Sequence, residues 1–85
     1  MTKVIVYSSG LCPYCTMAKQ FLARKGIEFD EIRIDMEPEK RQEMMEKSRQ
    51  RTVPQIFIND DAIGGYTDLI ALENSNRLDG LLAQS

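Results

Sequence analysis

The alternation of hydrophobic and polar positions divides the chain into short strands and helices. Residues 4–7 form a continuous apolar run, which is typical of a central strand covered on both faces. From Pro13 the apolar residues recur at helical spacing, and Gly26 is a typical helix-ending residue, so the pattern predicts a helix over residues 13–25. The stripe expected to be buried on that helix comprises Tyr14, Met17, Ala18, Phe21 and Leu22.

The rest of the pattern completes a mixed order of strands and helices. Further strands are predicted at residues 27–34, 53–58 and 62–63, and further helices at 37–48, 67–73 and 78–82. The order β-α-β-α-β-β-α predicts an α/β fold with a central mixed four-stranded sheet flanked by helices. We expect the first two strands to be parallel and joined by a right-handed crossover. The strands at 53–58 and 62–63 are expected to form a hairpin, which adds antiparallel strands to the sheet.

Composition narrows what such a fold can do. The 85 residues suffice for one domain, residues 1–85. Acidic residues outnumber basic ones by 13 to 11, so we expect no general affinity for nucleic acid. Histidine is absent from the sequence, which excludes imidazole catalysis and imidazole metal ligands. The apolar run near the N-terminus is too short for a signal peptide or a membrane span, so we expect a cytoplasmic protein without membrane attachment.

The two cysteines, Cys12 and Cys15, lie three positions apart at the start of the first predicted helix. Unpaired N–H groups and the positive end of the helix dipole stabilise an anion at this place. We therefore expect a lowered pKa for the Cys12 thiol, which makes Cys12 the attacking thiolate. Cys15 lies one turn further along, on the side that faces Cys12, and we expect it to be less exposed and to act as the resolving thiol.

Three other interpretations of the cysteine pair compete with this one. A structural disulfide across so short a loop would contribute about 2 kcal/mol, and the cytoplasm would reduce it. Cysteines also occur as small buried hydrophobic residues, but a proline-containing CxxC motif between a strand and a helix favours redox chemistry. Half of a tetrahedral metal site would need further ligands from outside the chain, so we predict no metal site within it.

Two later segments have the composition of ligand-binding backbone. Pro54 begins a strand, where a trans bond fits, and where a cis bond would free the preceding N–H and C=O for an extended peptide-like ligand. The segment 64–68 precedes a helix, where N–H groups bind a carboxylate, or where Thr67 or Asp68 caps the helix. A cationic cluster upstream of Pro54 either complements a helix end or anchors a ligand carboxylate. It comprises Lys47, Arg49 and Arg51.

Three motifs together resemble a dithiol glutaredoxin over essentially the whole chain. They are Cys12-Pro13-Tyr14-Cys15, Thr52-Val53-Pro54-Gln55-Ile56-Phe57-Ile58 and Gly64-Gly65-Tyr66-Thr67-Asp68-Leu69. The resemblance implies a thioredoxin fold, a cis peptide bond before Pro54, and glutathione as the reducing co-substrate with no tightly bound cofactor. It also implies that Cys12 takes glutathione from a mixed disulfide and that Cys15 resolves protein disulfides.

The resemblance further implies a glutathione site around the cysteine pair. Its residues are Tyr14, Arg51, Thr52, Val53, Pro54, Gly65, Tyr66, Thr67 and Asp68. The Val53 backbone would pair with the cysteine of glutathione, and Asp68 would lie at its γ-glutamyl end. Many family members carry a cation where this chain has Ser9, so more of the interaction with the glycine carboxylate is expected to fall to Arg51.

The expected function is therefore a glutathione-dependent thiol-disulfide oxidoreductase that reduces glutathione mixed disulfides and protein disulfides. Its expected partners are glutathione and glutathionylated or disulfide-containing proteins, with the chain acting as a monomer in cell redox homeostasis. One alternative is a redoxin that thioredoxin reductase, rather than glutathione, reduces. Another is a dimer that binds an iron-sulfur cluster through Cys12 of each chain and two glutathiones.

Overall fold

The computed structural model describes residues 2–83. Within them the elements are β1 (Val4–Ser8), α1 (Pro13–Arg24), β2 (Asp30–Arg33), α2 (Pro38–Ser48), β3 (Gln55–Ile58), β4 (Asp61–Gly64), α3 (Tyr66–Asn74) and α4 (Leu78–Ala83). The strands form one sheet in the order β2-β1-β3-β4. β1 is parallel to β2 and antiparallel to β3, and β4 is antiparallel to β3. The predicted mixed sheet and central first strand are confirmed, and the second strand lies at an edge of the sheet.

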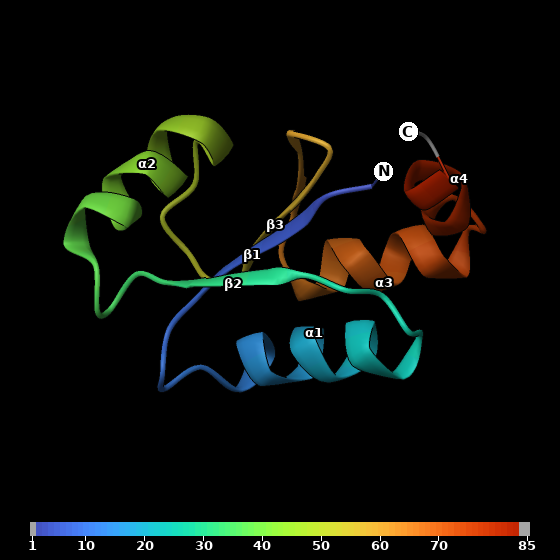
Figure 1. Ribbon diagram of the computed structural model, residues 1–85, viewed down its shortest axis with the longest axis horizontal. Helices are drawn as coiled ribbons and strands as arrows, with labels where there is room; N and C mark the ends of the chain where they lie inside the picture. The colour runs from blue at the N-terminus through green and yellow to red at the C-terminus, as the bar shows by residue number, and fades with distance from the viewer. Residues whose placement is uncertain (1, 84–85) are drawn as a thin grey trace.

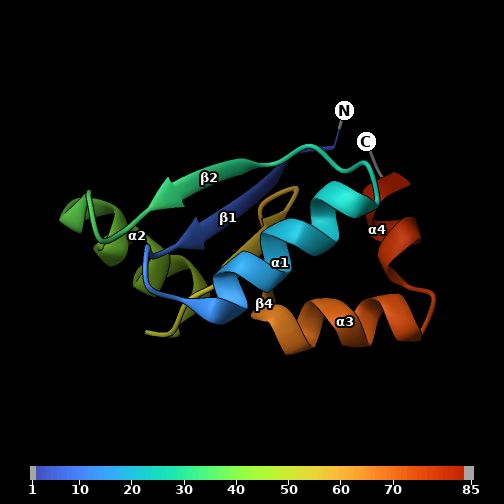
Figure 2. The ribbon, with the colours of Figure 1, turned by 90° about the horizontal axis from the view of Figure 1, so that it is seen from below.

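Helices cover both faces of the sheet. Figure 1 shows α2 above the sheet and α1 below it, and Figure 2 shows α1 and α3 side by side in front of the strands. Val6 of β1 belongs to the core cluster on the α1 and α3 side, together with Leu22 and Leu69. Tyr7, the next residue, belongs to the cluster on the α2 side with Met44. Because successive side chains of a strand point to opposite faces, this burial explains the continuous apolar run of β1.

Several element ends differ from the sequence prediction. β2 begins at Asp30 rather than residue 27, because the Ile27 N–H donates to Leu22 O (2.9 Å) at the end of α1. β3 begins at Gln55, since Pro54 has no N–H to offer the sheet. α3 begins at Tyr66, with Gly65 as its N-cap. Among residues 2–83, the helices are too short or too polar to cross a membrane.

The predicted buried stripe of α1 is wrong at two positions. Ala18 and Leu22 are fully buried and Phe21 packs against the core, as expected. Tyr14 is 57% exposed and Met17 is 40% exposed, whereas Cys15, which lies between them in sequence, has no exposed surface. The helix therefore turns its 15–18–22 face to the sheet, and it leaves Tyr14 and Met17 on its outer side.

Candidate active site

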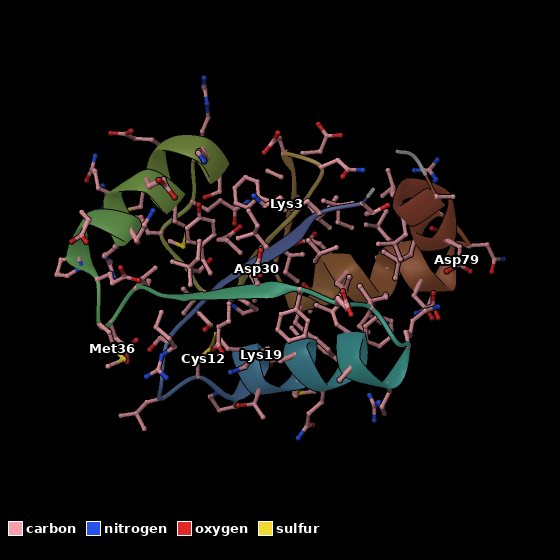
Figure 3. The ribbon with its side chains drawn as sticks, viewed as in Figure 1. Lys3, Cys12, Lys19, Asp30, Met36 and Asp79 are labelled. Carbon is pink, nitrogen blue, oxygen red and sulfur yellow. A yellow bond between two sulfur atoms is a disulfide. The ribbon has the colours of Figure 1, made fainter. Side chains whose placement is uncertain are left out.

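Cys12 and Cys15 form a disulfide at the first turn of α1, with their Cα atoms 5.2 Å apart. Cys12 is the N-cap residue, and its Sγ accepts a hydrogen bond from the Cys15 N–H at 3.1 Å. Pro13 takes the first helical position, where the N–H that it lacks would have no partner within the helix. Cys12 is half-buried and Cys15 is fully buried, so the predicted difference in exposure is confirmed. Figure 3 shows Cys12 where the loop after β1 enters α1.

The segment before β3 lies against the attacking sulfur. The peptide bond between Val53 and Pro54 is cis, as the motif resemblance implied. Cys12 Sγ lies 3.6 Å from the carbonyl oxygen of Val53. In the disulfide this sulfur carries no proton, so the short distance records proximity, and the reduced thiol would be within reach to donate. A segment 41 residues away in sequence thus forms one wall of the redox site.

The start of α3 forms a second wall. The rings of Tyr14 and Tyr66 lie with their centroids 6.1 Å apart at an interplanar angle of 31°. Tyr66 also packs against the core cluster of α1 and α3, so the anchored ring of Tyr66 supports the exposed ring of Tyr14. Next to it, a Cβ placed on Gly65 would lie 3.4 Å from the Pro54 carbonyl oxygen, which shows how closely this segment approaches the cis-proline segment.

The structure shows one of the two roles that the sequence left open for segment 64–68, the capping of α3. The Gly65 N–H donates to Asp68 Oδ2 at 2.9 Å, so Asp68 caps α3 from its third position rather than as the N-cap residue. Thr67 is exposed. A contact of either side chain with a ligand stays a prediction.

The predicted cationic cluster does not gather around one hollow. Lys47 lines a hollow between α2 and the sheet together with Tyr7 and Phe57. Arg49 and Arg51 line a different hollow, beside the end of α2. Arg51 and Thr52 are both exposed, in the loop that leads to Val53.

A charged pair that the sequence pattern did not indicate holds the loop before Cys12. The Gly10 N–H donates to Asp35 Oδ2 at 3.1 Å, and the Arg33 guanidinium binds both oxygens of Asp35 at 2.9 and 2.7 Å. Arg33 and the Gly10 N–H hold the pKa of Asp35 well below its usual range, so this carboxylate stays charged. The pair anchors the loop after β1 to the end of β2.

A second hydrogen-bonded network that the sequence pattern did not indicate joins β1, β2 and α1. The buried Ser8 donates to Glu31 Oε2 at 2.5 Å, and Lys19 of α1 lies 2.7 Å from the same oxygen. The hydrogen bond from Lys19, then that from Ser8, lowers the pKa of Glu31. No local signal in the sequence could have found these partners, because they come from different elements.

Large exposed hydrophobic side chains surround the redox pair. Leu11 is 99% exposed and Met36 is 72% exposed, in addition to Tyr14 and Met17. Leu11 and Met36 each follow one residue of the Gly10–Asp35 hydrogen bond, which brings their loops together. Figure 3 shows Met36 and Cys12 at the same end of the molecule. We call these four residues, Leu11, Tyr14, Met17 and Met36, the apolar rim.

Known proteins are similar to this chain in sequence and in fold. The family model described as Glutaredoxin matches residues 4–63. A glutaredoxin of Pseudomonas aeruginosa is 48% identical over 98% of this chain and 99% of its own length. The solution structure of glutaredoxin from Brucella melitensis superposes with a TM-score of 0.84 at 52% identity, covering 96% of this chain and 89% of that one. The crystal structure of a buckwheat glutaredoxin–glutathione complex superposes with a TM-score of 0.89 at 26% identity, covering 98% and 78%.

Proposed function

Because the chain belongs to the glutaredoxin family and is a glutathione-dependent thiol-disulfide oxidoreductase, we propose that Cys12 and Cys15 carry this reaction as attacking and resolving thiols. The observation that supports these roles is the placement of Cys12 at the N-cap of α1. There its sulfur accepts the Cys15 N–H and meets the positive end of the helix dipole. Both interactions favour the thiolate over the thiol.

On a glutathione mixed disulfide the reaction needs Cys12 alone. The Cys12 thiolate attacks the glutathionyl sulfur, the disulfide of the substrate breaks, and the substrate leaves as a thiolate that takes a proton from water. A second glutathione thiolate then attacks the glutathionyl sulfur on Cys12. This step forms glutathione disulfide and returns the Cys12 thiolate, so one free glutathione is consumed for each substrate thiol that is released.

On a protein disulfide the second cysteine takes part. Cys12 attacks one sulfur of the substrate and forms an intermolecular disulfide, while the substrate disulfide breaks and its other sulfur leaves as a thiolate that takes a proton from water. Cys15 loses its proton, attacks Cys12 Sγ, and releases the reduced protein while the Cys12–Cys15 disulfide forms. The bonded pair corresponds to this oxidised product. Two glutathiones then reduce it and leave as glutathione disulfide.

The glutathione site that we propose lies between the two walls of the redox pair. Its backbone element is Val53, whose carbonyl lies beside the sulfur of Cys12. The other proposed contacts are Tyr14, Arg51, Thr52, Pro54, Gly65, Tyr66, Thr67 and Asp68. A relative was crystallised with glutathione, which supports glutathione as the ligand of this shared fold. We propose that glutathione binds as a co-substrate, without a tightly bound cofactor.

The protein partners that we propose are glutathionylated and disulfide-containing proteins. We propose that a protein joined to Cys12 by a disulfide places its neighbouring residues against the apolar rim. When a partner covers exposed leucine, tyrosine and methionine side chains, apolar surface is removed from water and contact area is gained. We also propose that the chain acts as a single-domain monomer in the reducing cytoplasm, where a dithiol is kept ready to react.

Reduction kinetics with each candidate reductant test this proposal. We expect turnover of a glutathione mixed disulfide with glutathione and glutathione reductase, and little with thioredoxin reductase. Activity with thioredoxin reductase alone would refute the proposed function and support the redoxin alternative. Absorption in the visible range after anaerobic reconstitution with iron and sulfide, together with a dimer by light scattering, would instead support the iron-sulfur alternative.

A further inference from the structure

The amide of Gln55 lies buried behind the segment that we assign to glutathione. Gln55 follows Pro54, and only 1% of its surface is exposed. Its Nε2 lies 3.0 Å from the Thr52 carbonyl oxygen, 3.2 Å from Thr52 Oγ1 and 3.3 Å from Gln50 Oε1. All three acceptors belong to the loop that leads to Val53, so one buried side chain ties this loop to the first residue of β3.

The Thr52 carbonyl fixes which way the Gln55 amide faces. A carbonyl oxygen can only accept, so it must meet the NH2 group of Gln55 and not its oxygen. The Oε1 of Gln55 is buried without a hydrogen-bond partner among residues 2–83. The amide therefore acts on this loop only as a donor.

This orientation determines whether the Thr52 hydroxyl donates or accepts at its contact with Gln55. Because Nε2 of Gln55 donates, Thr52 Oγ1 must accept at that contact, and its own hydrogen points elsewhere. Thr52 is exposed, and it stands between Arg51 and Val53, whose carbonyl lies beside Cys12 Sγ. The loop thus carries an exposed hydroxyl and, next to it in sequence, an exposed guanidinium cation. A carboxylate suits both groups.

We propose that Gln55 is a positioning residue: its amide donates to Thr52 so that the Thr52 hydroxyl donates outward to the glycine carboxylate of bound glutathione. This inference rests on the proposed function and adds to it the buried residue that orients the Thr52 hydroxyl. With the ammonium end of glutathione near Asp68, the glycine carboxylate is the end left for the loop 51–52.

Steady-state kinetics with two matched probes test the inference. One probe is a mixed disulfide of glutathione with a small thiol, and the other carries an amide in place of the glycine carboxylate. With the first probe, we expect Thr52→Val and Gln55→Met each to raise KM about 5- to 10-fold, with kcat nearly unchanged. The double variant should be no worse than either single variant, because the two residues act through one hydrogen bond. Thr52→Ser, which keeps the hydroxyl, should retain most of the wild-type KM.

The amide probe and an additive double variant provide the outcomes that would overturn the inference. With the amide probe, whose neutral C=O accepts a weaker hydrogen bond than a carboxylate, the variant effects on KM should be smaller than with the first probe, and an undiminished variant effect would exclude the carboxylate. Multiplication of the two single effects in the double variant would show that Gln55 acts independently of Thr52. A wild-type protein inactive with glutathione would refute the proposed function itself, which is a distinct result.

Gln55→Glu gives a second test that does not depend on the stability of Gln55→Met. An ionised glutamate would accept from the Thr52 hydroxyl and turn its hydrogen inward, whereas a protonated glutamate would donate as the amide does. We expect the KM of Gln55→Glu, relative to wild type at each pH, to rise as pH increases. A ratio that does not change with pH would contradict the proposed polarity.

Discussion

Replacing Cys15 by serine should separate the two branches of the reaction. The sulfurs of Cys12 and Cys15 are bonded in the structure, so the resolving thiol is held in position to attack. Such preorganisation corresponds to an effective concentration of about 1 M or more, far above millimolar glutathione. We therefore expect Cys15→Ser to lower the rate of protein disulfide reduction by at least about 100-fold. Turnover of a small glutathione mixed disulfide, which does not use Cys15, should stay within about 3-fold of wild type.

The same variant has a stability cost that must be measured beside the activity. Cys15 is fully buried, so a serine hydroxyl in its place would lose its hydrogen bonds to water. We expect the free energy of unfolding to fall by about 1–3 kcal/mol. Urea unfolding of the reduced proteins measures this difference. Insulin reduction measures the protein branch, and a coupled assay with glutathione reductase measures the mixed-disulfide branch.

Cys12→Ser is the matched control because serine is a good N-cap residue. Its hydroxyl can accept the Cys15 N–H as the sulfur does, so α1 should keep its start. We expect this variant to fold and to lose both activities. Retained activity in Cys12→Ser, or loss of mixed-disulfide turnover in Cys15→Ser, would refute the assigned roles.

Three further predictions concern residues around the pair. Glu31→Gln should lower the free energy of unfolding by about 0.5–1 kcal/mol at neutral pH. Because Lys19 lowers the pKa of Glu31, this difference should disappear as pH falls through that lowered pKa, as measured by urea unfolding at several pH values. Gly64→Ala should destabilise by about 1–3 kcal/mol in the same assay, since Gly64 has φ +114°. Tyr66→Ala should raise KM for mixed disulfides about 2- to 10-fold by removing the support of Tyr14, whereas Tyr66→Phe should not.

Local patterns predicted most of the fold. Strand and helix periods depend on neighbours within a few residues, so the chain order and the sheet type could be derived from the sequence. Helix ends were also predictable where a residue type acts locally, as with Pro13 at the start of α1 and Gly26, which has φ +72°, after its end. The turn at Asn59 and Asp60, both with positive φ, joins β3 to β4 in the predicted strand order.

Periodicity was insufficient where the degree of burial depended on distant elements. Tyr14 and Met17 fit a helical apolar stripe, yet both are exposed beside the redox pair. Periodicity counts apolar residues but does not say which adjacent face of the helix meets the sheet. That choice depends on how α1 packs against the sheet and α3, and β3 and α3 lie far from α1 in sequence.

The sequence by itself determined the elements, their order and the chemistry of the pair, because Cys12-Pro13-Tyr14-Cys15 forms within one helical turn. Only the tertiary structure decided what surrounds that pair. Cys12 meets Val53 across 41 residues, and Tyr14 meets Tyr66 because α1 and α3 pack on the same face of the sheet. Such contacts depend on how the strand order β2-β1-β3-β4 brings chain segments together, and no local pattern encodes those distances.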